Sequence, residues 1–155
     1  MYLNKQQQCL LDAQLEDCRW LYNELLAARR AAWEQRQESV RLYDQQASLP
    51  PFKAVCPALA GVYSQVLQHV VVRIDLAFQA CFRRLRTGEK LGYPRFRGKG
   101  RYDSITFPQM PVGCRLDTAN RRLRIAHVGQ VKIILHRPLE GTPKTATISR
   151  NITGK

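Results

Sequence analysis

The sequence lacks three features that would place it in common functional classes: paired cysteines, long apolar runs and clustered carboxylates. Its five cysteines are odd in number and none stands in a Cys-x-x-Cys pair, so structural thiols are favoured over metal ligands. No apolar run approaches the roughly 20 residues that span a bilayer. The N-terminus has no apolar segment of the kind found in signal peptides. We therefore expect a cytoplasmic, reduced protein with no membrane partner.

Carboxylates are scarce in the half of the chain where nuclease chemistry would need them. Residues 81–155 contain only four, scattered among cations: Glu89, Asp103, Asp117 and Glu140. Two-metal phosphoryl transfer needs carboxylates that converge on the ions. The three histidines have no acid or thiol at ligand spacing. We expect no catalytic residue and no metal or other cofactor in this chain, and an enzyme with an unrecognised site is the least favoured alternative.

What the sequence has in excess is positive charge, and all of it lies in one half. The net charge is +13. Residues 1–80 hold eight Lys or Arg and eight Asp or Glu, whereas residues 81–155 hold seventeen and four. Arg outnumbers Lys by twelve to five in the basic half, and the planar guanidinium suits phosphates and base edges. A neutral half joined to a basic half indicates a scaffold with a polyanion-binding surface.

The most basic region ends in a segment, residues 92–102, that interleaves four cations with three aromatic rings. Cations neutralise phosphates, and flat rings stack on bases. Phe96 could stack on a base or anchor the segment in the core, and anchoring is favoured. For the segment as a whole, the alternative is a solvated basic loop. The candidate phosphate-binding residues of this region are Arg83, Arg84, Arg86, Lys90, Arg95, Arg97, Lys99 and Arg101.

Two long helices are predicted from apolar residues that recur every three or four positions. The first covers about 40 residues, begins after an N-cap at Asn4 and fades over residues 35–44. The second runs from about residue 60 to residue 86, with Gly88 as its C-cap. Residues 47–57 contain three prolines and are expected to be a connector. The two apolar stripes, which should pack on each other, are Leu11, Leu15, Cys18, Tyr22 and Leu25, and then Leu67, Val70, Ile74, Phe78, Cys81 and Leu85.

Short β-prone segments replace the helical period after residue 88. They are expected at residues 104–107, 115–117, 122–125, 131–135 and 145–148, with a hairpin turn at residues 118–121. Arg and apolar residues alternate over 122–125, which predicts one basic face and one buried face. The predicted fold class is α+β, with a long helical hairpin followed by a small antiparallel β-sheet or partial barrel.

Six ordered motifs lie between residues 2 and 104, and the resemblance that they carry covers nearly the whole chain. They are Tyr2-Leu3-Asn4-Lys5-Gln6-Gln7, Cys18-Arg19-Trp20-Leu21-Tyr22-Asn23, Ser64-Gln65-Val66-Leu67-Gln68, Ala77-Phe78-Gln79-Ala80-Cys81-Phe82-Arg83-Arg84, Gly88-Glu89-Lys90-Leu91-Gly92-Tyr93-Pro94-Arg95-Phe96-Arg97 and Tyr102-Asp103-Ser104. Together they strongly resemble the N-terminal part of the TnpB/OrfB proteins of insertion sequences. Those proteins are known as transposases and are RNA-guided DNA endonucleases related to type V CRISPR effectors.

The resemblance implies a helical recognition lobe, helix-turn-helix-like, over residues 1–88, and a basic loop with a β wedge domain over residues 89–155. In the family these parts bind a guide RNA and a target-adjacent DNA duplex. The RNase H-like nuclease domain, with its magnesium and zinc sites, lies further downstream, and the chain is expected to end before it. A short strand usually precedes the first motif, so a wedge one strand short, with an unpaired edge, is expected.

The implied function is therefore that of a binding module that cannot cut DNA alone. Its expected partners are guide RNA and target DNA duplex, and its expected location is the bacterial cytoplasm at the nucleoid. Three origins stay open: a truncated gene product, a decaying element, or one half of a split nuclease, in which case a separately encoded nuclease half is a further partner.

The resemblance also carries duplex-contacting positions onto this chain. Tyr43, just past the first helix, matches one of them. Ser64 and Gln68 match two more, one turn apart on the second helix, and a glutamine can satisfy both the donor and the acceptor of an adenine edge. The alternative is that Ser64 only forms part of a helical turn and that Gln68 is a solvated side chain. Thr106 and its neighbours match a further duplex contact.

Two function classes remain open. One is the nucleic-acid-binding module just described, and the other is a basic structural protein that packs RNA or DNA without reading its sequence. Phosphate contacts alone give salt-sensitive binding to every sequence, whereas base contacts add discrimination.

Overall fold

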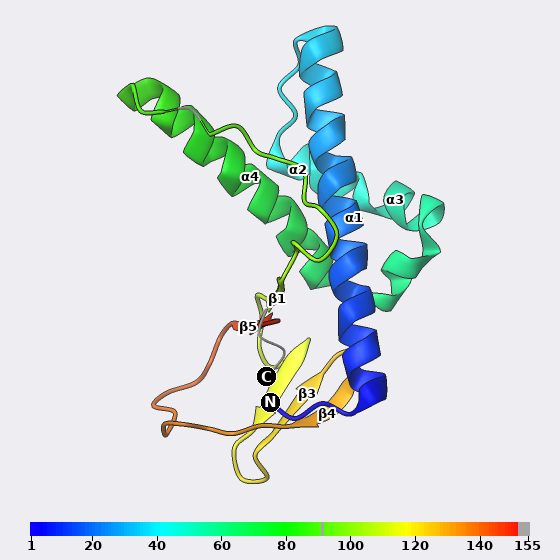
Figure 1. The fold of residues 1–155 in the computed structure, drawn as a ribbon, viewed down its shortest axis with the longest axis vertical. Helices are drawn as coiled ribbons and strands as arrows, with labels where there is room; N and C mark the ends of the chain where they lie inside the picture. The colour runs from blue at the N-terminus through cyan, green and yellow to red at the C-terminus, as the bar shows by residue number, and fades with distance from the viewer. Residues whose placement is uncertain (91, 152–155) are drawn as a thin grey trace.

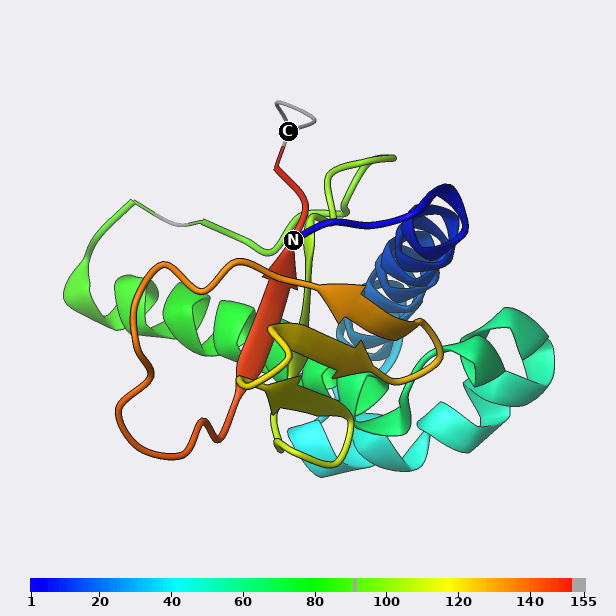
Figure 2. The same cartoon turned by 90° about the horizontal axis from the view of Figure 1, so that it is seen from below.

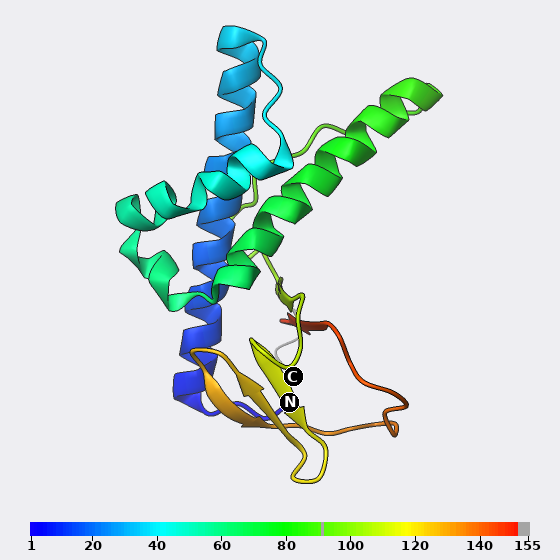
Figure 3. The same ribbon diagram turned by 180° about the vertical axis from the view of Figure 1, so that it is seen from behind.

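The computed structural model describes residues 1–90 and 92–151 and confirms the α+β class. Long N-terminal helices are followed by small antiparallel sheets (Figure 1). The two long helices, α1 and α4, diverge like the arms of a V, with the sheets beyond the closed end of the V (Figures 1 and 3). The two helices do not form the antiparallel hairpin that the sequence predicted, because both run away from the sheets and point in the same general direction (Figure 1). Gln14 of α1 contacts Gly61 just before α4, and Arg29, further along α1, contacts Asp75, further along α4. α2, α3 and η1 carry the chain back to the start of α4.

Helix α1, Lys5–Arg36, forms where the apolar stripe predicted it. Asn4 and Gln7 build a capping box in which each side chain accepts a hydrogen bond from the other's backbone amide, at 2.8 and 3.2 Å. All five stripe residues of this helix are buried. The helix ends at Gln37, which adopts a left-handed conformation with φ 55°.

Helix α4, Ser64–Thr87, ends as predicted at Gly88, whose φ of 71° is readily adopted by glycine. It begins about four residues later than expected, because a 3-10 turn, η1 (Pro57–Gly61), precedes it. The prediction that Leu85 belongs to the buried stripe is wrong, since this side chain is 63% exposed. By that point α4 has moved away from α1, and the last turn has no helix to pack on (Figure 1).

The prediction that residues 47–57 form a connector without regular structure is also wrong, because this region is mostly helical. It contains the end of α2 (Leu42–Ala47), all of α3 (Leu49–Val55) and the start of η1. Pro50 and Pro51 do not break α3, because they occupy its first turn. Backbone amides there have no intrahelical partner, so a missing N–H costs nothing.

Five short strands form two antiparallel sheets. The strands are β1 (Ser104–Phe107), β2 (Cys114–Asp117), β3 (Arg122–Ile125), β4 (Gly129–Lys132) and β5 (Ala146–Ser149). The first sheet pairs β1 with β5, and the second has the order β2-β3-β4. The predicted hairpin turn at 118–121 is confirmed. β4 starts two residues before the predicted segment because a tight turn, with His127 at φ 61°, brings Gly129 opposite Ile125.

The sheets do not close into a barrel within the described residues. The segment 133–145 leaves β4 and swings outward before it returns as β5 (Figure 2).

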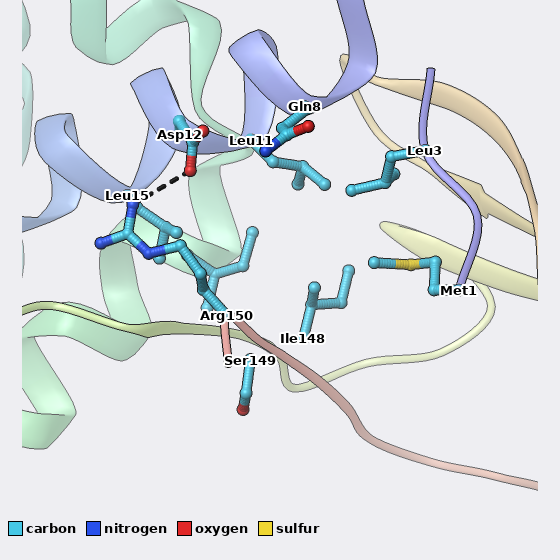
Figure 4. Close-up of a pocket in the computed structure, with 10 residues that line it drawn as sticks. Met1, Leu3, Gln8, Leu11, Asp12, Leu15, Ile148, Ser149 and Arg150 are labelled. Carbon is cyan, nitrogen blue, oxygen red and sulfur yellow. Dashed lines mark hydrogen bonds and ion pairs between the residues drawn. The ribbon is translucent and has the colours of Figure 1, made fainter. Parts of the chain in front are cut away.

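The N-terminal segment lies along the edge of β4, where the Tyr2 N–H donates to the Lys132 carbonyl at 2.8 Å. An apolar cavity of about 100 Å³ remains between Met1, α1 and β5, and the ion pair of Arg150 with Asp12, at 3.0 Å, lies beside it (Figure 4).

One hydrophobic cluster runs through the helices and both sheets. Phe107 of β1 is fully buried and stacks on Tyr63, just before α4, with ring centroids 6.2 Å apart. Gly113 permits this contact, since a Cβ at that position would lie 2.7 Å from Cδ1 of Tyr63. The cysteines predicted to be structural fit this core: Cys18 and Cys81 are buried, and burial raises the pKa of the Cys18 thiol to about 12.

Candidate nucleic-acid interface

Residues 92–102, called the strap below, lie along α1 and are tied to it by side chains of that helix. The Gly100 N–H donates to Oε1 of Glu16 at 3.2 Å. The side chain of Asn23 accepts from the Arg97 N–H at 2.8 Å and donates to the Arg97 carbonyl at 3.0 Å. A hydrogen bond from Arg19 holds the pKa of the Glu16 carboxyl below its usual range, so this anchor stays ionised at neutral pH.

The strap runs antiparallel to α1, and its aromatic rings help to attach it. Arg30 lies nearer the C-terminus of α1, and its Nη2 donates to the Pro94 carbonyl at 2.7 Å. The guanidinium carbon of Arg30 also lies 4.8 Å from the ring centroids of both Tyr93 and Phe96. Phe96 remains 49% exposed, so the favoured prediction that it anchors in the core is wrong. It anchors the strap on an arginine of the helix surface instead.

The third aromatic of the strap, Tyr102, is a packing residue. It is 5% exposed, and its ring centroid lies 6.1 Å from that of Tyr22 on α1. Arg73 of α4 also contacts this ring, with its guanidinium carbon 5.3 Å from the ring centroid of Tyr102. Burial raises the pKa of the Tyr102 phenol, which therefore stays neutral. The strap aromatics thus fix the position of the strap.

The cations of the strap and of the end of α4 remain free of acidic partners. All eight predicted phosphate-binding residues are exposed: Arg83, Arg84, Arg86, Lys90, Arg95, Arg97, Lys99 and Arg101. Four ion pairs occur within residues 1–90 and 92–151, and none of them engages one of these eight side chains. The backbone of the strap is therefore fixed while its positive charge stays available.

A polar cavity of about 440 Å³ opens between α1, α4 and the strap. Arg73, Arg97 and Arg101 contribute its cations. Arg73 is already committed, because it donates to the Ser104 carbonyl at 2.8 Å and to the Thr106 hydroxyl at 3.1 Å. The two strap arginines face this cavity without an ion-pair partner among the described residues.

A second basic surface, the exposed side of the β2-β3-β4 sheet, was left out of the sequence-based site. It is called the sheet face below. Arg115 lies directly opposite Arg124, and Arg122 lies between Asp117 and Lys132. Directly opposed like charges destabilise a sheet. The alternation of Arg and apolar residues over 122–125 correctly predicted the basic face of β3. Which residues of β2 and β4 lie beside these arginines depends on the strand register, which could not be predicted from the sequence.

The predicted base-reading residues of α4 are exposed on a polar surface at its N-terminal end. Ser64 is the first residue of the helix, and Gln68 lies one turn further on. Lys53 of α3, which the sequence gave no reason to include, donates to the Ser64 hydroxyl at 3.1 Å. Next to them, Gln65 donates to Gln109 at 2.6 Å, and this bond joins the helix to the segment after β1.

The two remaining candidates differ in accessibility. Tyr43 lies on α2 and is 78% exposed. Thr106 is 7% exposed, and its hydroxyl is 3.0 Å from that of Thr147 across the β1–β5 pair. This hydroxyl is committed to contacts inside the protein. A duplex contact by Thr106 stays a prediction without support from this geometry.

Residues 1–90 and 92–151 contain no group of three His, Cys, Asp or Glu side chains placed to hold a metal ion. The described helices also include none with the length and apolar character needed to cross a membrane.

A helical scaffold with fixed, exposed and unpaired cations is the arrangement of a nucleic-acid-binding protein. Comparison with protein families agrees with that class. Residues 1–38 match the family model described as a helix-turn-helix domain, that of the OrfB proteins of IS605-type elements. Over these residues the chain is similar to the N-terminal portion of OrfB/TnpB-family proteins, and this similarity suggests DNA binding by a transposase-related protein. Comparison with curated proteins gave no match.

The matched residues form a single helix rather than two. α1 continues without a turn from Lys5 to Arg36, and the next helix, α2, begins only at Leu42. The partner that packs along α1 in this structure is α4, which follows after α2, α3 and η1. The helix pair that presents the candidate residues is therefore formed by segments far apart in the sequence.

Proposed function

We propose that this chain is a nucleic-acid-binding module of an OrfB/TnpB-like protein, which binds a guide RNA and a target-adjacent DNA duplex and has no catalytic residue of its own. The strap is the observation that carries this proposal. Asn23 and Arg30 fix its backbone, while Arg95, Lys99 and Arg101 stay exposed. A fixed strap loses less conformational entropy on binding than a free loop, so its cations contribute more to affinity.

The candidate residues divide by chemistry into two roles. The strap, the end of α4 and the sheet face bind phosphates, which position the nucleic acid but carry no sequence information. Tyr43, Ser64 and Gln68 read the target-adjacent duplex, with residues 1–88 as the recognition lobe and 89–155 as the wedge. The N-terminus of α4 adds backbone amides and a helix dipole that favour a phosphate beside the bases that Gln68 reads. A separately encoded nuclease half would supply the chemistry, at the bacterial nucleoid.

The sheet face favours a second candidate function, a basic protein that packs RNA or DNA without reading it. Its exposed side chains are dominated by Arg115, Arg122, Arg124 and Lys132. Four cations on so small a sheet bind any phosphate backbone, whatever its sequence. The two candidates make different predictions for single variants.

Gln68→Ala is expected to reduce discrimination between duplexes much more than total affinity. One good base contact contributes about 1–3 kcal/mol of discrimination. The measurement is selection of bound DNA from a pool of duplexes with a randomised segment, followed by sequencing and by titration of selected and unrelated duplexes. Gln6→Ala, an exposed glutamine in the first turn of α1, is the matched control and should leave the selected sequence unchanged.

Arg95→Ala combined with Arg97→Ala should behave differently. This variant should weaken binding to every duplex and reduce the dependence of log affinity on log salt by about two. If Gln68→Ala and the double variant change affinity and discrimination alike, the division of roles is wrong. If the wild-type chain selects no sequence at all, the packing protein is the better account.

A further inference from the structure

Three exposed aromatic side chains line one hollow between the two arms of the V. They are Trp33 of α1, Phe82 of α4 and Tyr93 of the strap, and they are 53%, 53% and 42% exposed. Phe78, which is 7% exposed, also lines it, with its ring centroid 5.6 Å from that of Tyr93 in an edge-to-face arrangement. Single exposed aromatics are common on protein surfaces, but several around one hollow mark a binding site.

The size of the hollow limits what it can hold. Its volume is about 130 Å³, and residues 38–40, which lead into α2, complete its lining. An apolar cavity of roughly 150 Å³ accommodates one benzene ring. The open hollow therefore has about the size of one planar ring, and the backbone of a helix or a strand is too large to enter it.

The charges around the hollow favour a ring that is attached to phosphates. Two charged side chains line the hollow, and both are already paired. Arg29 binds Gln45 at 2.6 Å and Asp75 at 2.9 Å, and the carboxylate of Glu38 is in an ion pair with Arg36 at 2.7 Å. Arg86 is exposed one turn after Phe82 on the same side of α4, and Arg95 is exposed two residues after Tyr93. Neither is in an ion pair within the described part of the chain.

We propose that this hollow binds one unpaired base of a single-stranded nucleic acid, stacked against Trp33 and Phe82, with Arg86 and Arg95 on the flanking phosphates. The inference rests on the proposed nucleic-acid binding and adds to it a site for a base that is not in a duplex. Aromatic side chains bind single strands in this way, because every base has a face that can stack. A base inside a duplex cannot enter, since both of its faces are covered by neighbouring bases.

The hollow can be tested through the fluorescence of Trp33. The only other tryptophan, Trp20, packs edge-to-face on Phe52, so Trp20→Phe keeps an aromatic ring there and makes Trp33 the sole reporter. This full-length variant is titrated with single strands of about 12 nucleotides, one of RNA and one of DNA, with a DNA strand of the same length without bases, and with a duplex. The RNA and the DNA strand both offer unpaired bases that could stack in the hollow. Tighter binding of one of them shows whether the site takes a base from RNA or from DNA.

The expected result is quenching of Trp33 by a strand with bases and none by the abasic strand or the duplex, although both carry the same phosphates. Phe82→Ala should weaken binding of the base-containing strand by roughly 5- to 100-fold and leave binding of the duplex within about twofold. Leu85→Ala, an exposed apolar residue on the same helix outside the hollow, is the control and should change neither.

Equal affinity of the wild-type chain for base-containing and abasic strands, measured by anisotropy, would overturn the inference and needs no variant. In that case phosphate binding, and with it the proposed function, would still stand. Quenching of Trp33 by the duplex to the same extent as by the single strand would also overturn it. If no nucleic acid binds at all, both the inference and the proposed function fail.

Discussion

Replacing Arg95, Arg97, Lys99 and Arg101 together with glutamine is expected to lower the affinity for any nucleic acid by about 100-fold or more at roughly 150 mM salt. Each lost phosphate contact removes about 0.9 from the slope of log affinity against log salt, so four contacts remove roughly 3 to 4. The fold should persist, because α1 holds the strap through its backbone at Arg97 and Gly100 rather than through these charges. Fluorescence anisotropy at four salt concentrations measures both quantities.

A second variant that loses the same charge elsewhere on the surface shows whether affinity depends on where the cations lie or only on how many there are. Lys5, Arg41, Arg137 and Lys144 are exposed and lie outside the strap, the end of α4 and the sheet face. Their replacement with glutamine lowers the net charge by the same amount. If both fourfold variants lose affinity equally, the strap is only part of a general positive field, and the interface described above is wrong.

The second large effect concerns stability. Asp75→Ala is expected to lower the free energy of unfolding by about 3 kcal/mol, because it leaves the guanidinium of Arg29 buried without its counterion. The side chains of Arg29 and Asp75 are 7% and 19% exposed, and the ion pair between them is 2.9 Å long. Arg29 also donates to Gln45, which in turn donates to the Leu25 carbonyl. This network joins α1, α2 and α4.

Urea unfolding followed by helical circular dichroism measures this loss. Asp12→Ala is the matched control, because it removes the ion pair with Arg150, whose side chains are 37% and 43% exposed. An exposed pair contributes at most about 1 kcal/mol, so the control should be nearly neutral. A cost for Asp75→Ala no greater than that for Asp12→Ala would show that the Arg29 network does not hold the helices together.

Much of the helical part could be predicted from the sequence, because the signals for it are local. Capping at Asn4 and Gly88 and the stripe from Leu11 to Leu25 depend on residues within one turn of each other. The prediction was wrong where tertiary context decides. Pro50 and Pro51 resemble helix breakers until their place in a first turn is known, and Leu85 fits the stripe but lies where α4 has left α1.

The candidate site was predicted less well than the fold. Composition alone identified the strap cations, and the structure finds them exposed. The aromatics of the strap looked equally suited to stacking on bases, but Tyr93 and Phe96 stack on Arg30, more than 60 residues away in sequence. The pairing of Arg115 with Arg124 depends on strand register in the same way. Such contacts between distant residues leave no periodic signal in a single sequence.

The most direct test of the central claim is the affinity of the wild-type chain for duplex DNA and for RNA as salt is varied. The account predicts binding whose log affinity falls linearly with log salt, with a slope of about −4 or steeper, and the fourfold strap variant should make this slope shallower by roughly 3 to 4. Absence of binding at low salt, or binding that salt does not weaken, would contradict the claim that this chain binds nucleic acid through its unpaired cations.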